Sequence, residues 1–312
     1  MRITMTDKKI PLSDGIERFL NYTREKHLTE DTIIDYTSCC RYFLKWADKD
    51  IYCSEISEIM FDDYKSYLKS KNLASATVNN YLRHLKAVIN FFIEKEWTTY
   101  FKMKIDKRIK IKKVAYTDEE IEKLLKKPNM KKCNFPDYRN WVIICFLLAT
   151  GVRRNTLINI KISDLNFDEK IINLNVVKND MDYYLPMTEQ LKGILLDYLD
   201  IRQGTNDDYL FCSQTGSQLY KSTISTIVKR YNKIHGVSKT SVHLFRHTVA
   251  KNWALKSGNQ QKLQALLGHV TSAISQEYVN IYATDFRDEF EANNLLNAKM
   301  KDKKKITIKK VK

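Results

Sequence analysis

Residues 241–278 read SVHLFRHTVAKNWALKSGNQQKLQALLGHVTSAISQEY. Four side chains in this stretch suit phosphate chemistry: His243, Arg246, His269 and Tyr278. Arginine supplies a permanently charged fork of donors for phosphate oxygens, histidine exchanges a proton near neutral pH, and a phenol can act as a nucleophile. Together they could bind a phosphodiester, move its protons and attack it. This chemistry requires no metal and no nucleotide cofactor.

The spacing within the stretch places these groups on helices. His243 and Arg246 stand at i and i+3, so a helix that starts at Ser241 would project both from one face, about 5–6 Å apart. Gly268 follows three leucines and is typical of a helix end, which would leave His269 just beyond it. An isolated H-x-x-R is usually an ordinary polar helix surface, so the rest of the chain must decide.

Composition narrows the class of protein. The chain has 312 residues, enough for two domains, and a net charge of +16, which favours a polyanionic partner: nucleic acid or an anionic membrane surface. The longest apolar run, Trp141 to Ala149, is too short to span a bilayer, and the N-terminus lacks a signal peptide's apolar core. We therefore expect a cytoplasmic protein without a membrane association. The six cysteines form no C-x-x-C pair, which predicts reduced, mostly buried thiols.

The first third of the chain has a helical pattern throughout. Between Leu12 and about Met103, apolar residues recur three and four apart in four stripes, which predicts a small four-helix bundle. We expect helix caps at Ser13, Thr29 and Ser75. Lys102 to Lys113 then carries seven Lys or Arg among twelve residues and reads as a basic linker, either a solvated tether or a segment that crosses DNA phosphates.

The remaining chain is mainly helical with one small sheet. Thr117 and Glu120 form a capping box, and the segment from Tyr138 to Ala149 is apolar on nearly every side, as in a buried central helix. A short helix follows Gly151. Two alternating segments around residues 172–176 and 183–187 then predict a β-hairpin with Lys178 at its turn. Further helices are expected at Thr188–Ile201 and Ser222–Ile234, before the stretch quoted above.

Five boxes in order resemble the tyrosine site-specific recombinases, the phage-integrase and Xer-like group. They are Thr150-Gly-Val-Arg153, which resembles "T-G-x-R"; Lys178, eight residues before Pro186 of a "V-P-L"-like strand; His243-Leu-Phe-Arg246-His247-Thr248, which resembles "H-x-L-R-H-T"; Leu267-Gly-His269, which resembles "L-G-H"; and Tyr278, nine residues after His269. Each box is weak alone, but five in family order are hard to produce by chance.

The resemblance implies a mainly α fold with a small antiparallel β-sheet, arranged as a two-domain C-shaped clamp on DNA. Residues 1–103 would form a SAM-like helical core-DNA-binding domain, 104–114 a basic linker, 115–296 the catalytic domain and 297–312 a basic tail. The tail carries eight lysines in sixteen residues and is either a disordered solubilising segment or a phosphate-binding arm.

The candidate catalytic residues are Arg153, Lys178, His243, Arg246, His269 and Tyr278. Both arginines would stabilise charge on the phosphate, and His269 would donate a hydrogen bond to it. His243 would take the proton of the Tyr278 phenol, and Lys178 would protonate the leaving 5′ oxygen. Arg154 and Tyr282 are the rival arginine and nucleophile, and we expect a structural role for His247.

The implied function is site-specific recombination through a 3′-phosphotyrosine intermediate. Double-stranded DNA is the expected partner, bound by a homo-tetramer on two sites, and accessory DNA-bending proteins are compatible with it. The segment from Glu277 to Tyr282 resembles mobile-element integrases more than chromosomal Xer proteins, which favours integration and excision. The alternatives are Xer-like resolution of chromosome or plasmid dimers, a monomeric type IB topoisomerase with the same chemistry, and a DNA-binding relative that lost catalysis.

Overall fold

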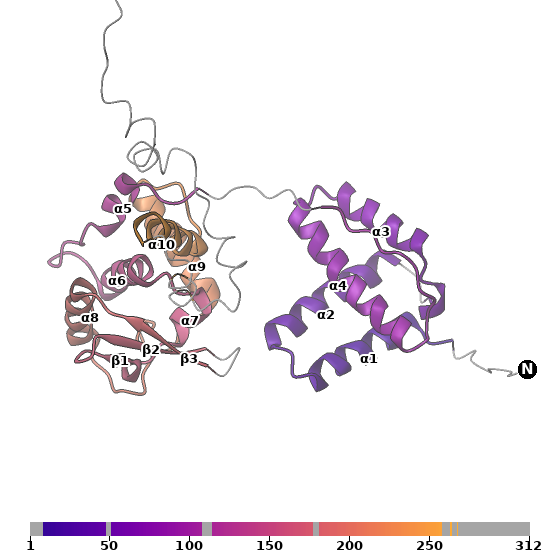
Figure 1. Ribbon diagram of the computed structural model, residues 1–312, viewed down its shortest axis with the longest axis horizontal. Helices are drawn as coiled ribbons and strands as arrows, with labels where there is room; N and C mark the ends of the chain where they lie inside the picture. The colour runs from indigo at the N-terminus through magenta and orange to yellow at the C-terminus, as the bar shows by residue number, and fades with distance from the viewer. Residues whose placement is uncertain are drawn as a thin grey trace, which may run out of the picture. The chain divides into compact units, whose positions relative to one another are not determined.

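The computed structural model describes residues 9–47, 51–107, 114–176 and 181–257, together with Leu263 and Leu267. The chain divides into two compact units, Met1–Ile111 and Lys112–Lys312, which are described separately below (Figure 1). Each unit is built around one long helix. Among the helices described, none is both long and apolar enough to cross a bilayer.

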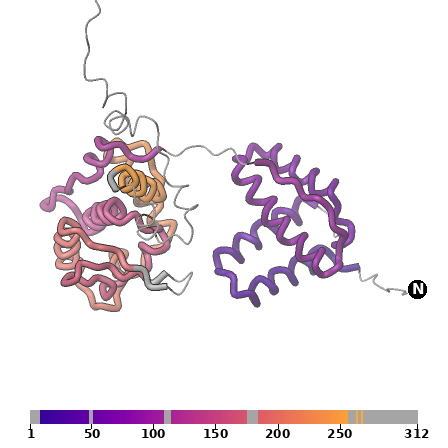
Figure 2. Tube along the Cα trace, viewed as in Figure 1, coloured from indigo at the N-terminus to yellow at the C-terminus, as the bar shows by residue number. Residues whose placement is uncertain are grey.

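The N-terminal unit is the expected helical bundle. Its helices are α1 (Leu12–Glu25), α2 (Glu30–Ala47), α3 (Glu58–Ser70) and α4 (Ser75–Glu94), with the short 3₁₀ turn η1 (Cys53–Glu55) between α2 and α3. Helix α4 contacts the other three, and Figure 2 shows the path of the chain through them. Its buried residues recur three and four apart, so they face the bundle core: Val78, Leu82, Leu85, Val88, Ile89 and Phe92.

The predicted caps of this bundle are partly wrong. Helix α1 begins at Leu12 after Pro11, so Ser13 lies inside its first turn, and α4 begins at Ser75 itself after Ala74. Proline preceding α1 has a fixed φ that suits a helix start, which allows the helix to begin earlier than the first serine. Thr29 does stand immediately before α2. Ser57 caps α3, since its side chain accepts a hydrogen bond from the N–H of Met60 at 3.3 Å.

The first residues of the predicted linker are attached to the N-terminal unit. The Asp106 carboxylate lies 2.8 Å from the Lys65 Nζ and 2.7 Å from the Lys69 Nζ. The backbone carbonyl of Asp106 also accepts a hydrogen bond from the buried side chain of Asn79 at 2.9 Å. These contacts hold the chain against α3 and α4 as far as Asp106.

Helix α6 (Phe135–Thr150) is the centre of the C-terminal unit. It contacts α5 (Asp118–Leu125), α8 (Glu189–Arg202), α9 (Lys221–Ile234) and α10 (Val242–Ser257). Its residues from Trp141 to Leu147 are all buried, as the uninterrupted apolar sequence predicts. Asn134 caps its start by accepting from the N–H of Asp137 at 2.9 Å, and Gly151 ends it in the left-handed conformation with φ of 61°.

The small sheet is antiparallel in the order β1-β2-β3, from β1 (Leu165–Asn166), β2 (Ile171–Val176) and β3 (Met181–Pro186). The register pairs Ile172 with Leu185 and ends at the pair Val176 and Met181. Ile172, Leu174 and Leu185 are buried, which confirms the alternation found in the sequence. Residues 177–180, between β2 and β3, lie outside the described part of the chain.

Two glycines in helices should respond oppositely to alanine. A Cβ on Gly15 of α1 would meet the Sγ of the buried Cys53 and the Phe92 ring, whereas a Cβ on Gly193 of α8 would meet nothing within 4 Å. Gly15→Ala should lower the free energy of unfolding of the N-terminal unit by about 1–3 kcal/mol, because overpacking exceeds the gain in helix propensity. Gly193→Ala should stabilise the C-terminal unit by about 0.5–1 kcal/mol.

Calorimetry on the full chain measures both effects. Adding Cys53→Ala to Gly15→Ala should recover part of the lost stability by removing the sulfur that the new methyl meets. A stabilising Gly15→Ala would show that the close approach in α1 is not a constraint.

Candidate functional site

Helix α10 carries two of the predicted catalytic residues in its first turns. Its first turn is closed by a hydrogen bond from the N–H of Leu244 to the carbonyl of Ser241 at 3.0 Å, so the expected helix start is confirmed. His243 is exposed, whereas Arg246, one turn further along, is only 3% exposed. His247, to which we assigned a structural role, is buried as well.

The Arg246 guanidinium joins two other boxes. Its Nη1 donates to the backbone carbonyl of Gly151 at 2.9 Å, and its Nη2 donates to the carbonyl of Leu267. Gly151 belongs to the T-G-x-R box and Leu267 begins the L-G-H box. A planar guanidinium held at two nitrogens has a fixed orientation, so the fold positions this permanent charge rigidly.

Gly151 allows α10 to lie close to the end of α6, where Arg246 bonds to the Gly151 carbonyl. Its left-handed φ of 61° turns the chain at the end of α6, and a Cβ there would meet the Val249 side chain of α10 at 3.2 Å. The Thr150 hydroxyl donates to the carbonyl of Phe146 at 2.7 Å. Glycine therefore serves both the turn and the close packing of α6 against α10.

Arg153 follows two residues after Gly151 and is the N-cap residue of α7 (Arg154–Asn159). Its side chain is half-buried. The rival Arg154 is hydrogen-bonded through its Nη1 to the Ser225 hydroxyl of α9 at 2.7 Å. Arg154 is therefore engaged in joining α7 to α9, a role consistent with support of the site.

Three predicted residues, Lys178, His269 and Tyr278, lie outside the described residues, as does the rival Tyr282. Described residues lie close in the sequence to two of them, Lys178 and His269. Strands β2 and β3 precede and follow the four residues that include Lys178, and Leu267, two residues before His269, is buried against Ala250 and Leu263. Within the described residues, Arg246 is thus brought together with Gly151 of the T-G-x-R box and with Leu267 of the L-G-H box.

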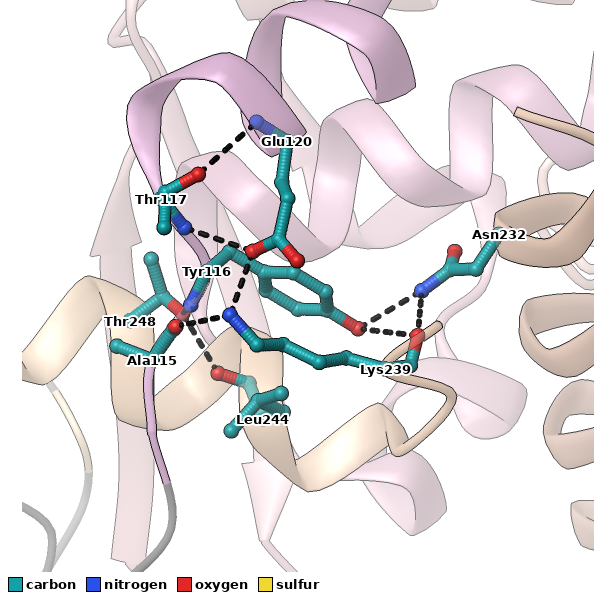
Figure 3. A network of polar contacts seen from close by, with 8 residues as sticks. All are labelled: Ala115, Tyr116, Thr117, Glu120, Asn232, Lys239, Leu244 and Thr248. Carbon is teal, nitrogen blue, oxygen red and sulfur yellow. Dashed lines mark hydrogen bonds and ion pairs between the residues drawn. The ribbon is translucent and has the colours of Figure 1, made fainter. Parts of the chain in front are cut away.

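A polar network attaches the beginning of the C-terminal unit to α10 (Figure 3). The N–H of Tyr116 donates to the Thr248 hydroxyl at 3.0 Å, and this hydroxyl donates to the carbonyl of Leu244 at 2.9 Å. Lys239, in the loop before α10, donates to Glu120 at 2.6 Å. The sequence identified Thr117 and Glu120 as a capping box, which is confirmed at 2.9 and 3.3 Å.

Sequence reasoning did not find Lys239 or Tyr116. Lys239 lies 119 residues from Glu120 in the chain, so no periodicity or local spacing connects them. Thr248 was part of a recognised box, but its structural role became visible only with its partner Tyr116 in place.

Two family models match the chain. The phage integrase family model matches residues 115–285, more than half of the sequence, and the phage integrase SAM-like domain matches residues 16–111. The chain belongs to the phage integrase family. It is a tyrosine site-specific recombinase, a DNA strand transferase. The family expectation drawn from the five boxes is confirmed.

Among known recombinases, the chain is 27% identical to the tyrosine recombinase XerA of Pyrococcus furiosus, over 91% of this chain and 95% of that protein. The fold is similar to the Tn1549 transposon integrase in complex with a circular intermediate DNA, with a TM-score of 0.74 and 19% identity, covering 91% of this chain and 99% of that one. It also resembles a lambda integrase tetramer bound to a Holliday junction, with a TM-score of 0.70 and 16% identity over 88% and 78% of the two chains.

The ion pair between Lys239 and Glu120 should make the stability of this recombinase depend on pH. Burial by itself raises the pKa of Glu120, but the hydrogen bonds from Lys239 and from the Thr117 N–H outweigh it and hold the pKa below its ordinary value of 4.5. A lowered carboxyl pKa stabilises the folded state above the ordinary pKa, and this stabilisation is lost as pH falls through the lowered value. The wild type should therefore keep its protection in α5 and α10 at about pH 6 and lose it progressively below about pH 5, as the pH falls through 4.5 and the lowered pKa beneath it.

Hydrogen–deuterium exchange, corrected for intrinsic rates, checks this expectation. Glu120→Gln should start with lower protection at about pH 6 and change less on acidification, since glutamine does not titrate. Glu122→Gln, an exposed position on the same helix, is the matched control and should follow the wild type. Equal pH dependence in Glu120→Gln and wild type would contradict the role of the ion pair.

Proposed function

We propose that this recombinase cuts one DNA strand by attack of the Tyr278 phenol on a phosphodiester. The observation that carries the proposal is the Arg246 guanidinium, which is buried and bonded to the carbonyls of Gly151 and Leu267. Burying a permanent charge is costly, so a buried guanidinium fixed among three sequence boxes is well suited to an anionic reacting group.

The proposed cleavage step is a displacement at phosphorus. The Tyr278 Oη forms a bond to phosphorus while the bond from phosphorus to the 5′ oxygen breaks. The phenol proton passes to His243, and Lys178 donates a proton to the leaving 5′ oxygen. Arg153, Arg246 and His269 bind the non-bridging oxygens, on which negative charge accumulates. The products are a 3′-phosphotyrosyl enzyme and a 5′ hydroxyl.

Strand exchange is the reverse reaction with a different hydroxyl. When the 5′ hydroxyl of a second DNA attacks the phosphotyrosine, the phenol leaves and the phosphodiester is restored. The covalent intermediate conserves the energy of the broken linkage, so no nucleotide is consumed.

We propose double-stranded DNA as the partner, bound by both units, with four protomers acting on two sites. The net charge of +16 and the similarity to the lambda integrase tetramer support this assembly. Bending a short duplex costs about 1–6 kcal/mol. Accessory proteins that bend DNA could supply this free energy, so they are compatible with such an assembly.

For the biological role we propose integration and excision of a mobile element. The segment from Glu277 to Tyr282 and the similarity to the Tn1549 transposon integrase support it. Xer-like dimer resolution is the second candidate, favoured by the similarity to XerA over nearly the whole chain. Sequencing the DNA that flanks the gene distinguishes them: element ends beside the gene support integration, and their absence supports resolution.

Covalent trapping tests the chemistry. Nicked suicide duplexes, tiled across the DNA that flanks the gene and incubated with the full chain in EDTA, should give a covalent protein–DNA adduct, because the cut end diffuses away and religation is prevented. Tyr278→Phe should give none, whereas Tyr282→Phe should still form the adduct. An adduct with Tyr278→Phe would move the nucleophile elsewhere, and no adduct from any duplex with the wild type would contradict the recombination mechanism.

DNA binding should weaken steeply with salt. Each phosphate contact contributes roughly 0.9 to the slope of log affinity against log salt concentration, because binding releases counterions. Arg153→Ala should reduce this slope by about 0.9, and the charge-retaining Arg153→Lys should keep it. Fluorescence anisotropy over a salt series measures both slopes, and an unchanged slope in Arg153→Ala would exclude a phosphate contact by this residue.

A further inference from the structure

Lys239 is held at both its side chain and its backbone. Its Nζ donates to the carbonyl of Ala115 at 2.8 Å and to the Glu120 carboxylate at 2.6 Å. Its backbone carbonyl accepts from the Asn232 amide at 2.6 Å and from the Tyr116 hydroxyl at 3.5 Å. Figure 3 shows these partners around Lys239: Asn232 near the end of α9, Ala115 and Tyr116 in the segment that leads into α5, and Glu120 in α5 itself.

The partners of Lys239 are themselves fixed. Asn232 is fully buried and its amide also donates to the Tyr116 hydroxyl at 2.8 Å. The Lys239 and Glu120 side chains are 23% and 20% exposed, so their ion pair is partly shielded from water. Removing one partner of such a pair is costly, because the remaining charge is left incompletely solvated.

The same segment also holds α10 around Arg246. Tyr116 packs its ring on Phe245 with ring centroids 4.7 Å apart, and its N–H donates to the Thr248 hydroxyl. Phe245 and Thr248 stand one residue before and two residues after Arg246. The contacts of Tyr116 therefore fix the helix around Arg246, and those of Lys239 fix the loop that precedes the helix.

Relaxation of the loop that contains Lys239 should affect Arg246 and His243 differently. Arg246 is bonded to the carbonyls of Gly151 and Leu267, so it stays in place when the loop before α10 relaxes. His243 stands in the first turn of α10, only four residues after Lys239, so the position of its backbone follows that of the preceding loop directly. A change in the loop before α10 should thus displace His243 much more than Arg246.

We propose that Lys239, through its ion pair with Glu120, is a positioning residue for the cleavage step that keeps His243 in register with the anchored Arg246. This inference rests on the roles proposed above for His243 and Arg246. Displacing a proton acceptor by about 1 Å costs up to about a hundredfold in rate, while phosphate binding by the anchored arginine is retained.

Single-turnover cleavage of the suicide duplex by the full chain tests the proposal. Lys239→Met keeps most of the unbranched side chain but removes the charged amine. It should lower the cleavage rate at saturating DNA about tenfold to a hundredfold, with the Kd for DNA within about twofold of wild type. The deficit should shrink as pH rises toward the ordinary tyrosine pKa of about 10, because the phenol then ionises without its acceptor. Lys239→Arg should recover most of the rate.

Two further variants separate positioning from folding and from DNA contact. Glu120→Gln should reproduce the Lys239→Met defect, and the double variant should be no slower than the slower single one, because the two residues act as a unit. Lys233→Met, which removes an exposed charge near the end of α9, should cleave like the wild type. Hydrogen–deuterium exchange across α6 establishes that each variant is folded.

The outcomes are distinct. A Lys239→Met variant that cleaves at the wild-type rate, or one that loses DNA affinity but cleaves normally at saturation, would overturn the positioning role; the second result would make Lys239 a DNA contact. Additive losses in the double variant would also overturn it. A wild-type chain that forms no adduct would instead contradict the proposed function on which this inference depends.

Discussion

The catalytic unit depends on one buried guanidinium. Arg246 extends from α10 and bonds to the carbonyl of Gly151 at the end of α6 and to that of Leu267 beyond α10. Because a buried charge without such partners would be strongly destabilising, these bonds constrain all three segments at once. The left-handed conformation of Gly151 turns its carbonyl toward the arginine, and the absence of a side chain lets α10 approach. The geometry of the site thus follows from satisfying one charge.

A second group of contacts holds α10 independently of that charge. Tyr116 contributes its ring to Phe245 and its N–H to Thr248, and Lys239 joins the entering loop to Glu120. These residues follow closely on the segment between the two units, and on the N-terminal side Asp106 is held by Lys65 and Lys69. The chain is therefore attached to the N-terminal unit up to Asp106 and to the C-terminal unit from Ala115 onward.

Helix positions could be predicted from the sequence because burial imposes a period of 3.6 residues that apolar side chains follow. The bundle stripes, the apolar α6 and the alternating hairpin all appear in the structure as expected. Helix starts were less predictable. Ser13 and Ser75 are good capping residues, yet the helices begin at Leu12 and Ser75, since packing of the whole bundle outweighs the roughly 1 kcal/mol available from a cap.

By itself, the sequence determined the family and the identity of the candidate catalytic residues, because chemistry requires particular side chains and the chain order of the boxes is written in the sequence. Arg153, His243 and Arg246 could be named in this way. Only the tertiary structure decided what holds them: the carbonyls that orient Arg246, the bond that engages Arg154 with Ser225, and the pairing of Lys239 with Glu120. Such partners are distant in sequence and are often backbone atoms, which every residue carries, so no pattern of side chains reveals them before the chain is folded.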